Sequence, residues 1–159
     1  MIPTTTTPQL SVTRVVDAPR TTVYRAFTEP DQVREWWGPD GAVMPRDEMA
    51  FDVRPGGHQR WTEVSETDPN VHVLIGLDLA EVVEGELIAG TMHVDGTLPF
   101  GYQPFATGLR IEFHDEAQGR TRIEIQQWLP EHLAAPSDNG WGESFTKLDA
   151  FLAEQASRA

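Results

Sequence analysis

The sequence predicts an α+β fold in which a curved antiparallel sheet of about six to seven strands wraps around one long C-terminal helix. The stretch Asp138 to Ala156 has a helical apolar stripe, residues 42–125 alternate in polarity, and two short helical segments follow the first strand. The stripe places large apolar residues at steps of three and four: Trp141, Phe145, Leu148, Phe151 and Leu152. Asp138 is positioned to accept a hydrogen bond from a backbone N–H at the helix start. Because the stripe is rich in aromatic residues, it needs a broad apolar partner, which the preceding strands can supply.

The N-terminal part of the chain is predicted to contain one strand and two short helices. Leu10 to Val16 is rich in β-branched residues, which favours a strand. Pro19 suits the first turn of the helix that follows, because its fixed backbone angle matches helical geometry. A second helix runs from Pro30 to Trp37, and the Gly-Pro pair after it ends the helix.

The middle of the chain is predicted to form consecutive antiparallel strands joined by short turns. The segments that alternate in polarity are residues 49–53, 58–64, 71–79, 87–95, 109–114 and 121–125. The alternation breaks between Leu79 and Val83, where we expect a β-bulge. The segment Thr97 to Phe105 contains two prolines and several aromatic residues and is predicted to be an ordered loop.

Composition and charge limit the classes of partner. The chain of 159 residues carries 12 Lys and Arg against 25 Asp and Glu, for a net charge of -13. Because nucleic acids and anionic membrane surfaces are bound through cationic side chains, we expect neither as a partner. No apolar run approaches the roughly 20 residues of a membrane helix, so we expect no membrane insertion. The absence of cysteine excludes disulfides and thiolate metal sites.

The domain organisation is predicted to be simple. Residues 1–9 (M-I-P-T-T-T-T-P-Q) are expected to be a flexible tail, and residues 10–157 a single domain without linker or repeat. The N-terminal residues lack the basic region and apolar core of a secretory signal, so we expect a cytoplasmic protein, either a monomer or a homodimer. No phosphate loop or dinucleotide fingerprint occurs, and no cofactor is expected.

Three segments resemble one known superfamily, in the same order along the chain. They are A-P-R-T-T-V-Y-R-A-F-T-E-P-D-Q-V-R-E-W-W-G-P at residues 18–39, F-D-V-R-P-G-G at residues 51–57, and G-W-G-E-S-F-T-K-L-D-A-F-L at residues 140–152. They are similar to the SRPBCC or START-like superfamily, the birch-pollen-allergen type, in its branch of heat-shock-protein-90 ATPase activator homologues. The resemblance spans residues 10–152 and implies a helix-grip fold with a hydrophobic cavity between sheet and C-terminal helix.

The resemblance implies that this cavity holds a hydrophobic small molecule of polyketide-like, polycyclic or lipid-like structure. The protein would then be a carrier or sequestering protein, in natural-product biosynthesis or self-resistance. The residues predicted to contact the ligand are Trp36, Trp37, Trp61, Phe100, Tyr102, Phe105, Phe113, Trp141, Phe145 and Leu148. Phe100, Tyr102 and Phe105 are predicted to gate the cavity with the helix that carries Trp36 and Trp37. Loops rarely carry so many large aromatic residues unless they cover an opening.

Two other functions remain open: a polyketide cyclase/aromatase-like or other cavity enzyme, and a chaperone-interacting module. The catalytic candidates are His93 with Asp95, which stand two apart on one strand face, and His58. An imidazole beside a carboxylate can act as a general base, whereas the alternative is a pair of solvated groups at a strand end. The five histidines are scattered and lack the helical spacing of common zinc ligands, so no metal is expected.

Overall fold

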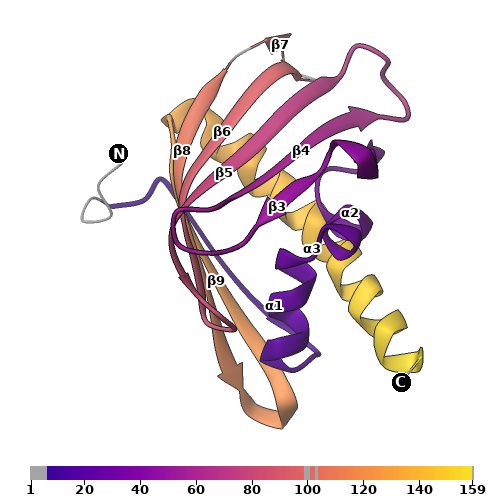
Figure 1. Cartoon of the computed structure of the whole chain (residues 1–159), viewed down its shortest axis with the longest axis vertical. Helices are drawn as coiled ribbons and strands as arrows, with labels where there is room; N and C mark the ends of the chain where they lie inside the picture. The colour runs from indigo at the N-terminus through magenta and orange to yellow at the C-terminus, as the bar shows by residue number, and fades with distance from the viewer. Residues whose placement is uncertain (1–6, 99–100, 103, 159) are drawn as a thin grey trace.

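A curved antiparallel sheet wraps around the C-terminal helix in the computed structural model of the chain (Figure 1). The structure describes residues 7–98, 101–102 and 104–158. Within these residues the sheet has nine strands: β1 (Leu10–Val16), β2 (Ala42–Val43), β3 (Ala50–Asp52), β4 (His58–Ser65), β5 (His72–Val83), β6 (Leu87–Leu98), β7 (Gly101–Tyr102), β8 (Phe105–Glu116) and β9 (Arg120–Trp128). The predicted fold class is confirmed, and the two-residue strands β2 and β7, which were not predicted, account for the larger strand number.

The helices also follow the predicted order. Two short α-helices come after β1, and one long helix ends the chain: α1 (Arg20–Thr28), α2 (Pro30–Trp36) and α3 (Ala134–Arg158). Single turns of 3-10 helix occupy connections: η1 (Arg46–Glu48), η2 (Ala117–Gly119) and η3 (Glu131–Leu133). None of the described helices combines the length and apolar character needed to cross a membrane.

The strands neighbour one another in the order β1-β9-β8-β6-β5-β4-β2, while β3 also pairs with β4 and β7 with β6. Every one of these pairs is antiparallel. The register of β5 against β6 shifts between Leu79 and Glu81, which confirms the predicted bulge. The bulge adds local twist to the pair of β5 and β6, which have 12 residues each, and helps the sheet to curve around α3.

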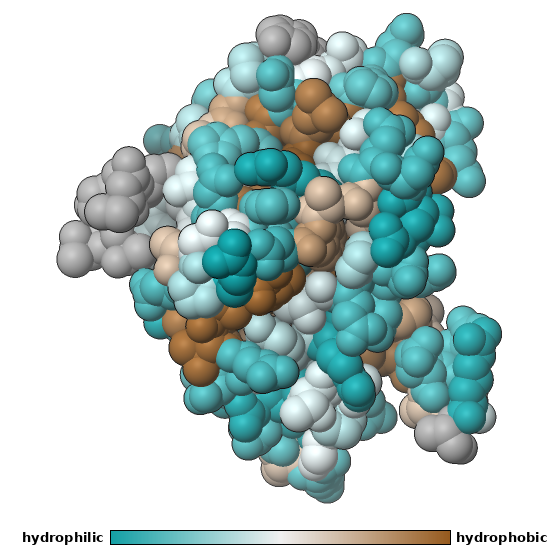
Figure 2. Space-filling model, in the orientation of Figure 1, coloured by the Kyte–Doolittle hydropathy of each residue, from teal (hydrophilic) through white to brown (hydrophobic). Residues whose placement is uncertain are grey.

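One face of the sheet packs on α3, and strand side chains alternate accordingly. On β5, Val73, Ile75 and Leu77 are buried, whereas Leu74 on the other face is 52% exposed. The α3 stripe is buried against the sheet through Trp141, Phe145, Leu148 and Leu152, and Phe151 is partly buried. Figure 2 shows the outcome on one side of the molecule, where polar residues cover most of the surface between apolar patches.

Two local predictions were wrong. α3 begins at Ala134, so Asp138 lies inside the helix and does not cap its start. A proline is tolerated at position 136, in the first turn of α3, because the first N–H groups of a helix have no intrahelical acceptor. The segment Thr97 to Phe105 is not simply a loop, because β6 and β7 pair within it and β8 begins at its last residue. Residues 1–6 of the predicted tail lie outside the described residues.

Candidate functional site

A pocket of about 140 Å³ lies beside the N-terminal half of α3, between this helix, the segment after α2, and strands β4, β6, β8 and β9. It is lined by Trp37, Gly38, Pro39, Glu63, Met92, Phe105, Gln127, Ser137, Gly140, Trp141 and Ser144. Apolar walls that carry a few fixed polar groups are typical of small-molecule sites. Sites for drug-sized ligands usually measure roughly 300–1,000 Å³, so this pocket encloses a smaller molecule or one group of a larger molecule.

Four other hollows are larger but differ in character. One of about 420 Å³ lies between β1 and α3, and one of about 410 Å³ lies beside α1. Their linings are mainly exposed or partly exposed polar and charged residues, such as Asp138 in the first and Arg20 in the second. The remaining two, of about 320 and 240 Å³, lie beside the C-terminal end of α3 and along β4, and Glu63 also borders the second. Among these five hollows, only the pocket of about 140 Å³ combines aromatic walls with buried polar side chains, so we take it as the candidate site.

The segment Trp37 to Pro39 forms one wall of the pocket, and two side chains of α3 hold it. The Ser144 hydroxyl accepts a hydrogen bond from the Gly38 N–H at 2.9 Å and donates to the Gly38 carbonyl at 3.2 Å. Lys147 Nζ donates to the carbonyl oxygens of Trp37 and Pro39, at 3.4 and 3.2 Å. Because four backbone contacts come from one helix, the position of this wall is coupled to that of α3.

Gly38 has a reason to be glycine at this wall. Its φ is +91°, a conformation that residues with a Cβ rarely adopt. An added Cβ would also meet the Ala42 Cβ at 2.9 Å and Glu63 Oε2 at 3.3 Å. The close approach of backbone to the Glu63 carboxyl therefore depends on the missing side chain.

Two tryptophan rings form a corner of the pocket. Trp37 and Trp141 meet edge to face, with ring centroids 5.1 Å apart and planes at 78°. The Trp141 indole N–H donates to Gln127 Oε1 at 3.0 Å, and Gln127 Nε2 donates to Thr107 Oγ1 at 3.2 Å. These hydrogen bonds fix the Trp141 ring relative to β8 and β9.

Glu63 brings an acidic group into this apolar pocket. Its side chain faces inward from β4, and the residue is 8% exposed. Burial raises the pKa of its carboxyl to about 7, against the opposing effects of the Lys147 charge and of a hydrogen bond from the Trp37 side chain. The pKa of Lys147 is lowered by its own partial burial, although Asp40, Glu63 and Glu143 oppose that effect. Near neutral pH, the pocket therefore holds a carboxyl that is divided between its neutral and charged forms.

Three of the ten predicted ligand-binding residues line the pocket: Trp37, Phe105 and Trp141. Five belong to the buried core and are not in its lining: Trp36, Trp61, Phe113, Phe145 and Leu148. Two of these support the wall, because the Trp61 ring packs on Trp37 and the Phe145 ring stacks on Trp141. Phe100 and the Tyr102 side chain lie outside the described part of the chain.

The catalytic candidates lie on the other face of the sheet. Met92 lines the pocket, so its neighbour His93 projects from the opposite face and is 55% exposed. His93 Nε2 lies 3.0 Å from Oδ2 of Asp78, which is on β5. His58, on β4, lies opposite the same Asp78 in the strand register. Asp95 is exposed on the same outer face. The idea that these residues face the cavity is thereby corrected, since strand alternation directs them away from α3.

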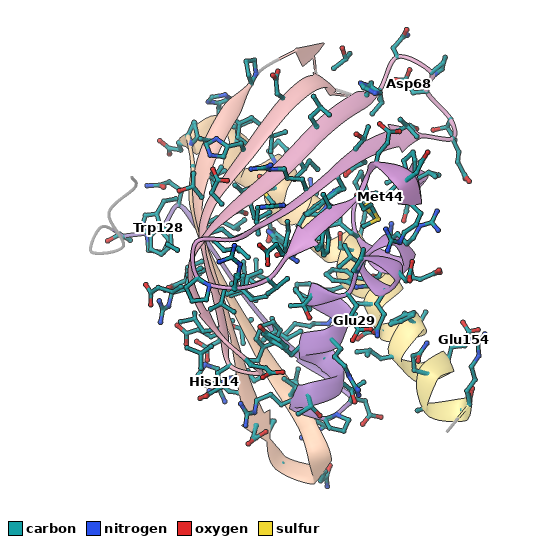
Figure 3. All side chains as sticks on the ribbon, in the orientation of Figure 1. Glu29, Met44, Asp68, His114, Trp128 and Glu154 are labelled. Carbon is teal, nitrogen blue, oxygen red and sulfur yellow. The ribbon has the colours of Figure 1, made fainter. Side chains whose placement is uncertain are left out.

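A histidine and two glutamates also gather on the outer face. Ligating atoms of Glu112, His114 and Glu124 lie within 4.8 Å of one another, and Figure 3 labels His114 on the side of the sheet away from α1. Arg110 Nε donates to Glu112 at 2.6 Å, and Arg122 Nε donates to Glu124 at 2.7 Å. Because these arginines already neutralise both carboxylates, a metal ion would have to displace them, and we assign the cluster to surface ion pairing.

The sequence interpretation did not single out Glu63, Gln127, Met92 or Ser144, although all four line the pocket. A signal existed for Glu63, because it lies two residues after Trp61 and must share its face of β4. Ser144 likewise lies three residues after Trp141, at helical spacing. Neither signal indicates that these polar groups would meet in one pocket, which depends on how α3 crosses the sheet.

Solved structures of other proteins share this architecture. The chain is similar to a solved protein of Chromobacterium violaceum at 26% identity, covering 89% of this chain and 94% of that one, with a TM-score of 0.73. An AHSA1 protein of Silicibacter pomeroyi matches at 17% identity over 92% and 98% of the two chains, with a TM-score of 0.74. DynU16, from the dynemicin biosynthetic locus, matches at 17% identity over 91% of this chain and 46% of its own, with a TM-score of 0.66.

No curated protein matches the chain. Residues 17–153 match the family described as Activator of Hsp90 ATPase homolog 1-like protein, which is the branch that the three sequence segments resemble. This match covers most of the sequence, and the helix-grip architecture around α3 accompanies it. The chain therefore belongs to the Activator of Hsp90 ATPase homolog 1-like protein family.

Proposed function

We propose that the protein binds a small, largely apolar organic molecule in the pocket beside α3 and acts as a carrier or sequestering protein. The observation that carries this proposal is the lining itself, in which Trp37, Phe105 and Trp141 surround the Glu63 and Gln127 side chains. Trp37 and Phe105 are only partly buried, and they belong to the proposed gate of the pocket. A polycyclic or lipid-like ligand would place one ring or one end group in the pocket, because its volume is about 140 Å³.

Gly140 allows the pocket to be blocked without removing any contact. It lines the pocket from α3, and a Cβ at this position would meet no atom within 4 Å. Gly142 offers a matched control, because it also lies on α3 with no atom within 4 Å of an added Cβ, but does not line the pocket. Replacing either glycine also favours the helix, by up to about 1 kcal/mol.

The experiment begins with native mass spectrometry of the protein purified from its own host, followed by denaturing release of any bound compound. The released compound is then titrated into wild type, Gly140→Leu and Gly142→Leu. We expect Gly140→Leu to lose binding and Gly142→Leu to keep it, while both fold at least as stably as wild type. Equal binding by both variants would place the ligand elsewhere and remove the proposal. The chemical structure of the released compound also shows whether the ligand is a natural product.

A further inference from the structure

The buried Glu63 carboxyl has no cationic partner at ion-pair distance. Within the described residues, no lysine, arginine or histidine nitrogen lies within 4.0 Å of its oxygens. The Trp37 side chain donates a hydrogen bond to it, and Lys147 acts on it only from a greater distance. Burying an ionised carboxylate without a paired cation is unfavourable. The pocket therefore offers a negative charge that a ligand can compensate.

The walls around this charge are aromatic. The ring planes of Trp37 and Trp141 meet at 78°, and Phe105 contributes a third aromatic side chain to the same lining. The face of an aromatic ring carries negative electrostatic potential and attracts cations, tryptophan most strongly. Aromatic walls beside a carboxylate are the combination that recognises alkylated ammonium groups.

The charges nearby also favour a positive ligand. Lys147 is the cation that acts on Glu63, and two further carboxylates, those of Asp40 and Glu143, act on Lys147. Together with Glu63 they make three acidic groups around one ammonium, in a protein of net charge -13. Such a field repels anionic ligands and raises the local concentration of cations.

We propose that the pocket recognises organic cations, with a protonated amine or quaternary ammonium group held against Trp37 and Trp141 and with Glu63 as its counter-ion. This inference rests on the proposed function, because it names the chemical class of the ligand for the same pocket. The pocket volume of about 140 Å³ suits a compact head group whose apolar remainder extends past Phe105.

The ionisation of Glu63 makes the inference sensitive to pH. Because the pKa of this carboxyl is about 7, binding a cation must shift it fully to its charged form. Affinity for a cation should therefore rise between about pH 6 and about pH 8, since less proton release is needed at the higher pH. A neutral hydrogen-bond acceptor, bound by the protonated carboxyl, would show the opposite slope.

The test compares the affinity for choline with the affinity for its uncharged carbon analogue 3,3-dimethyl-1-butanol. Binding is measured by tryptophan fluorescence or by the indole N–H signals in NMR. We expect wild type to bind choline at least about tenfold more tightly, which corresponds to about 1.4 kcal/mol. Glu63→Gln should lose this preference and the pH slope, while still accepting a hydrogen bond from Trp37. Glu154→Gln, which removes an exposed carboxylate near the end of α3, should keep both.

Failure of the inference can be separated from failure of the proposed function. If 3,3-dimethyl-1-butanol binds as well as choline and Gly140→Leu blocks both, the pocket binds small molecules but the assignment to cations is overturned. Choline binding that persists in Gly140→Leu overturns the inference, because the probe then binds outside the pocket. The proposed function fails only if the compound released from the native protein also binds Gly140→Leu as it binds wild type. Preference for choline that survives in Glu63→Gln overturns the role of this carboxylate as counter-ion.

Discussion

The indole Nε1 of Trp141 donates a hydrogen bond to Oε1 of Gln127 at 3.0 Å and so joins α3 to β9 in the pocket wall. Gln127 continues the chain by donating through Nε2 to Oγ1 of Thr107 on β8 at 3.2 Å. All three residues are buried, with Thr107 fully inaccessible to solvent. Because an unsatisfied buried polar group is unfavourable, these hydrogen bonds restrict Trp141 to one orientation of its ring.

Gln127→Leu should therefore lower the free energy of unfolding by about 1–3 kcal/mol, since the Trp141 N–H loses its acceptor and Thr107 loses a donor. Urea denaturation followed by far-UV circular dichroism measures this loss. Gln126→Leu is the matched control on the outer face of the same strand, and we expect a change within about 0.5 kcal/mol. Similar losses in the two variants would show that the hydrogen-bonded chain contributes nothing specific.

Ser144→Ala should loosen the pocket wall formed by Trp37 to Pro39. The Gly38 N–H loses the hydroxyl that accepts its hydrogen bond, and the Gly38 carbonyl loses a donor. We expect faster hydrogen exchange at the Gly38 amide and a stability loss of about 1 kcal/mol or more, measured by NMR and by urea denaturation. Thr146→Ala removes an exposed hydroxyl bonded within the same helix, and Gly38 should keep its protection there. Unchanged exchange in Ser144→Ala would contradict the coupling between α3 and this wall.

Removing the outer-face histidine should leave ligand binding intact. His93 and Asp78 are 55% and 60% exposed and lie on the face of the sheet away from α3, so their pair contributes about 0–1 kcal/mol. We expect His93→Ala to bind the compound released from the native protein as wild type does, by calorimetric titration, with little change in melting temperature. A variant that still binds the compound but no longer converts it would favour the alternative of a cavity enzyme.

The fold could be predicted from the sequence because the spacing of apolar residues differs between helices and strands. The α3 stripe has a period near 3.6, and the buried residues of β5 recur every second position, so each element shows which side it buries. Such periodicity is absent from β7, which has only two residues, and the prolines around it indicated a loop instead. A proline before a helix and a proline in its first turn look alike in sequence, so Pro136 does not show that α3 begins at Ala134.

The site could be predicted only in part, because residue type does not show which pocket a side chain reaches. Trp36 and Trp37 are adjacent, yet they diverge by about 100° at the end of α2, so one is buried in the core and the other lines the pocket. Phe113 lies on the inner face of β8, but its ring packs edge to face against Tyr24 and Phe27 of α1. Glu63 is not expected in a pocket lining, because charged residues are seldom buried, yet this buried residue gives the pocket its charge.

The elevated pKa of Glu63 also affects the stability of the fold. The unfolded chain releases this proton near its ordinary pKa of about 4.3, whereas the folded chain retains it up to about pH 7. Between these values the folded state binds more protons than the unfolded state. The contribution of Glu63 to stability is therefore fully present below about pH 4 and is lost as the pH rises to about 7.

Glu63→Gln should remove this dependence and become more stable than wild type above about pH 7, because the variant never buries a charge at this site. The shift of the pKa corresponds to about 2–4 kcal/mol between the two extremes of pH. Urea denaturation of both proteins at about pH 5 and about pH 8 gives the free energy of unfolding of each. The difference between wild type and variant isolates the contribution of Glu63, because the histidines common to both cancel. Glu154→Gln should follow wild type at each pH. If Glu63→Gln also follows wild type, the carboxyl is charged in the folded protein at both pH values, and its burial has been offset by a partner such as Lys147.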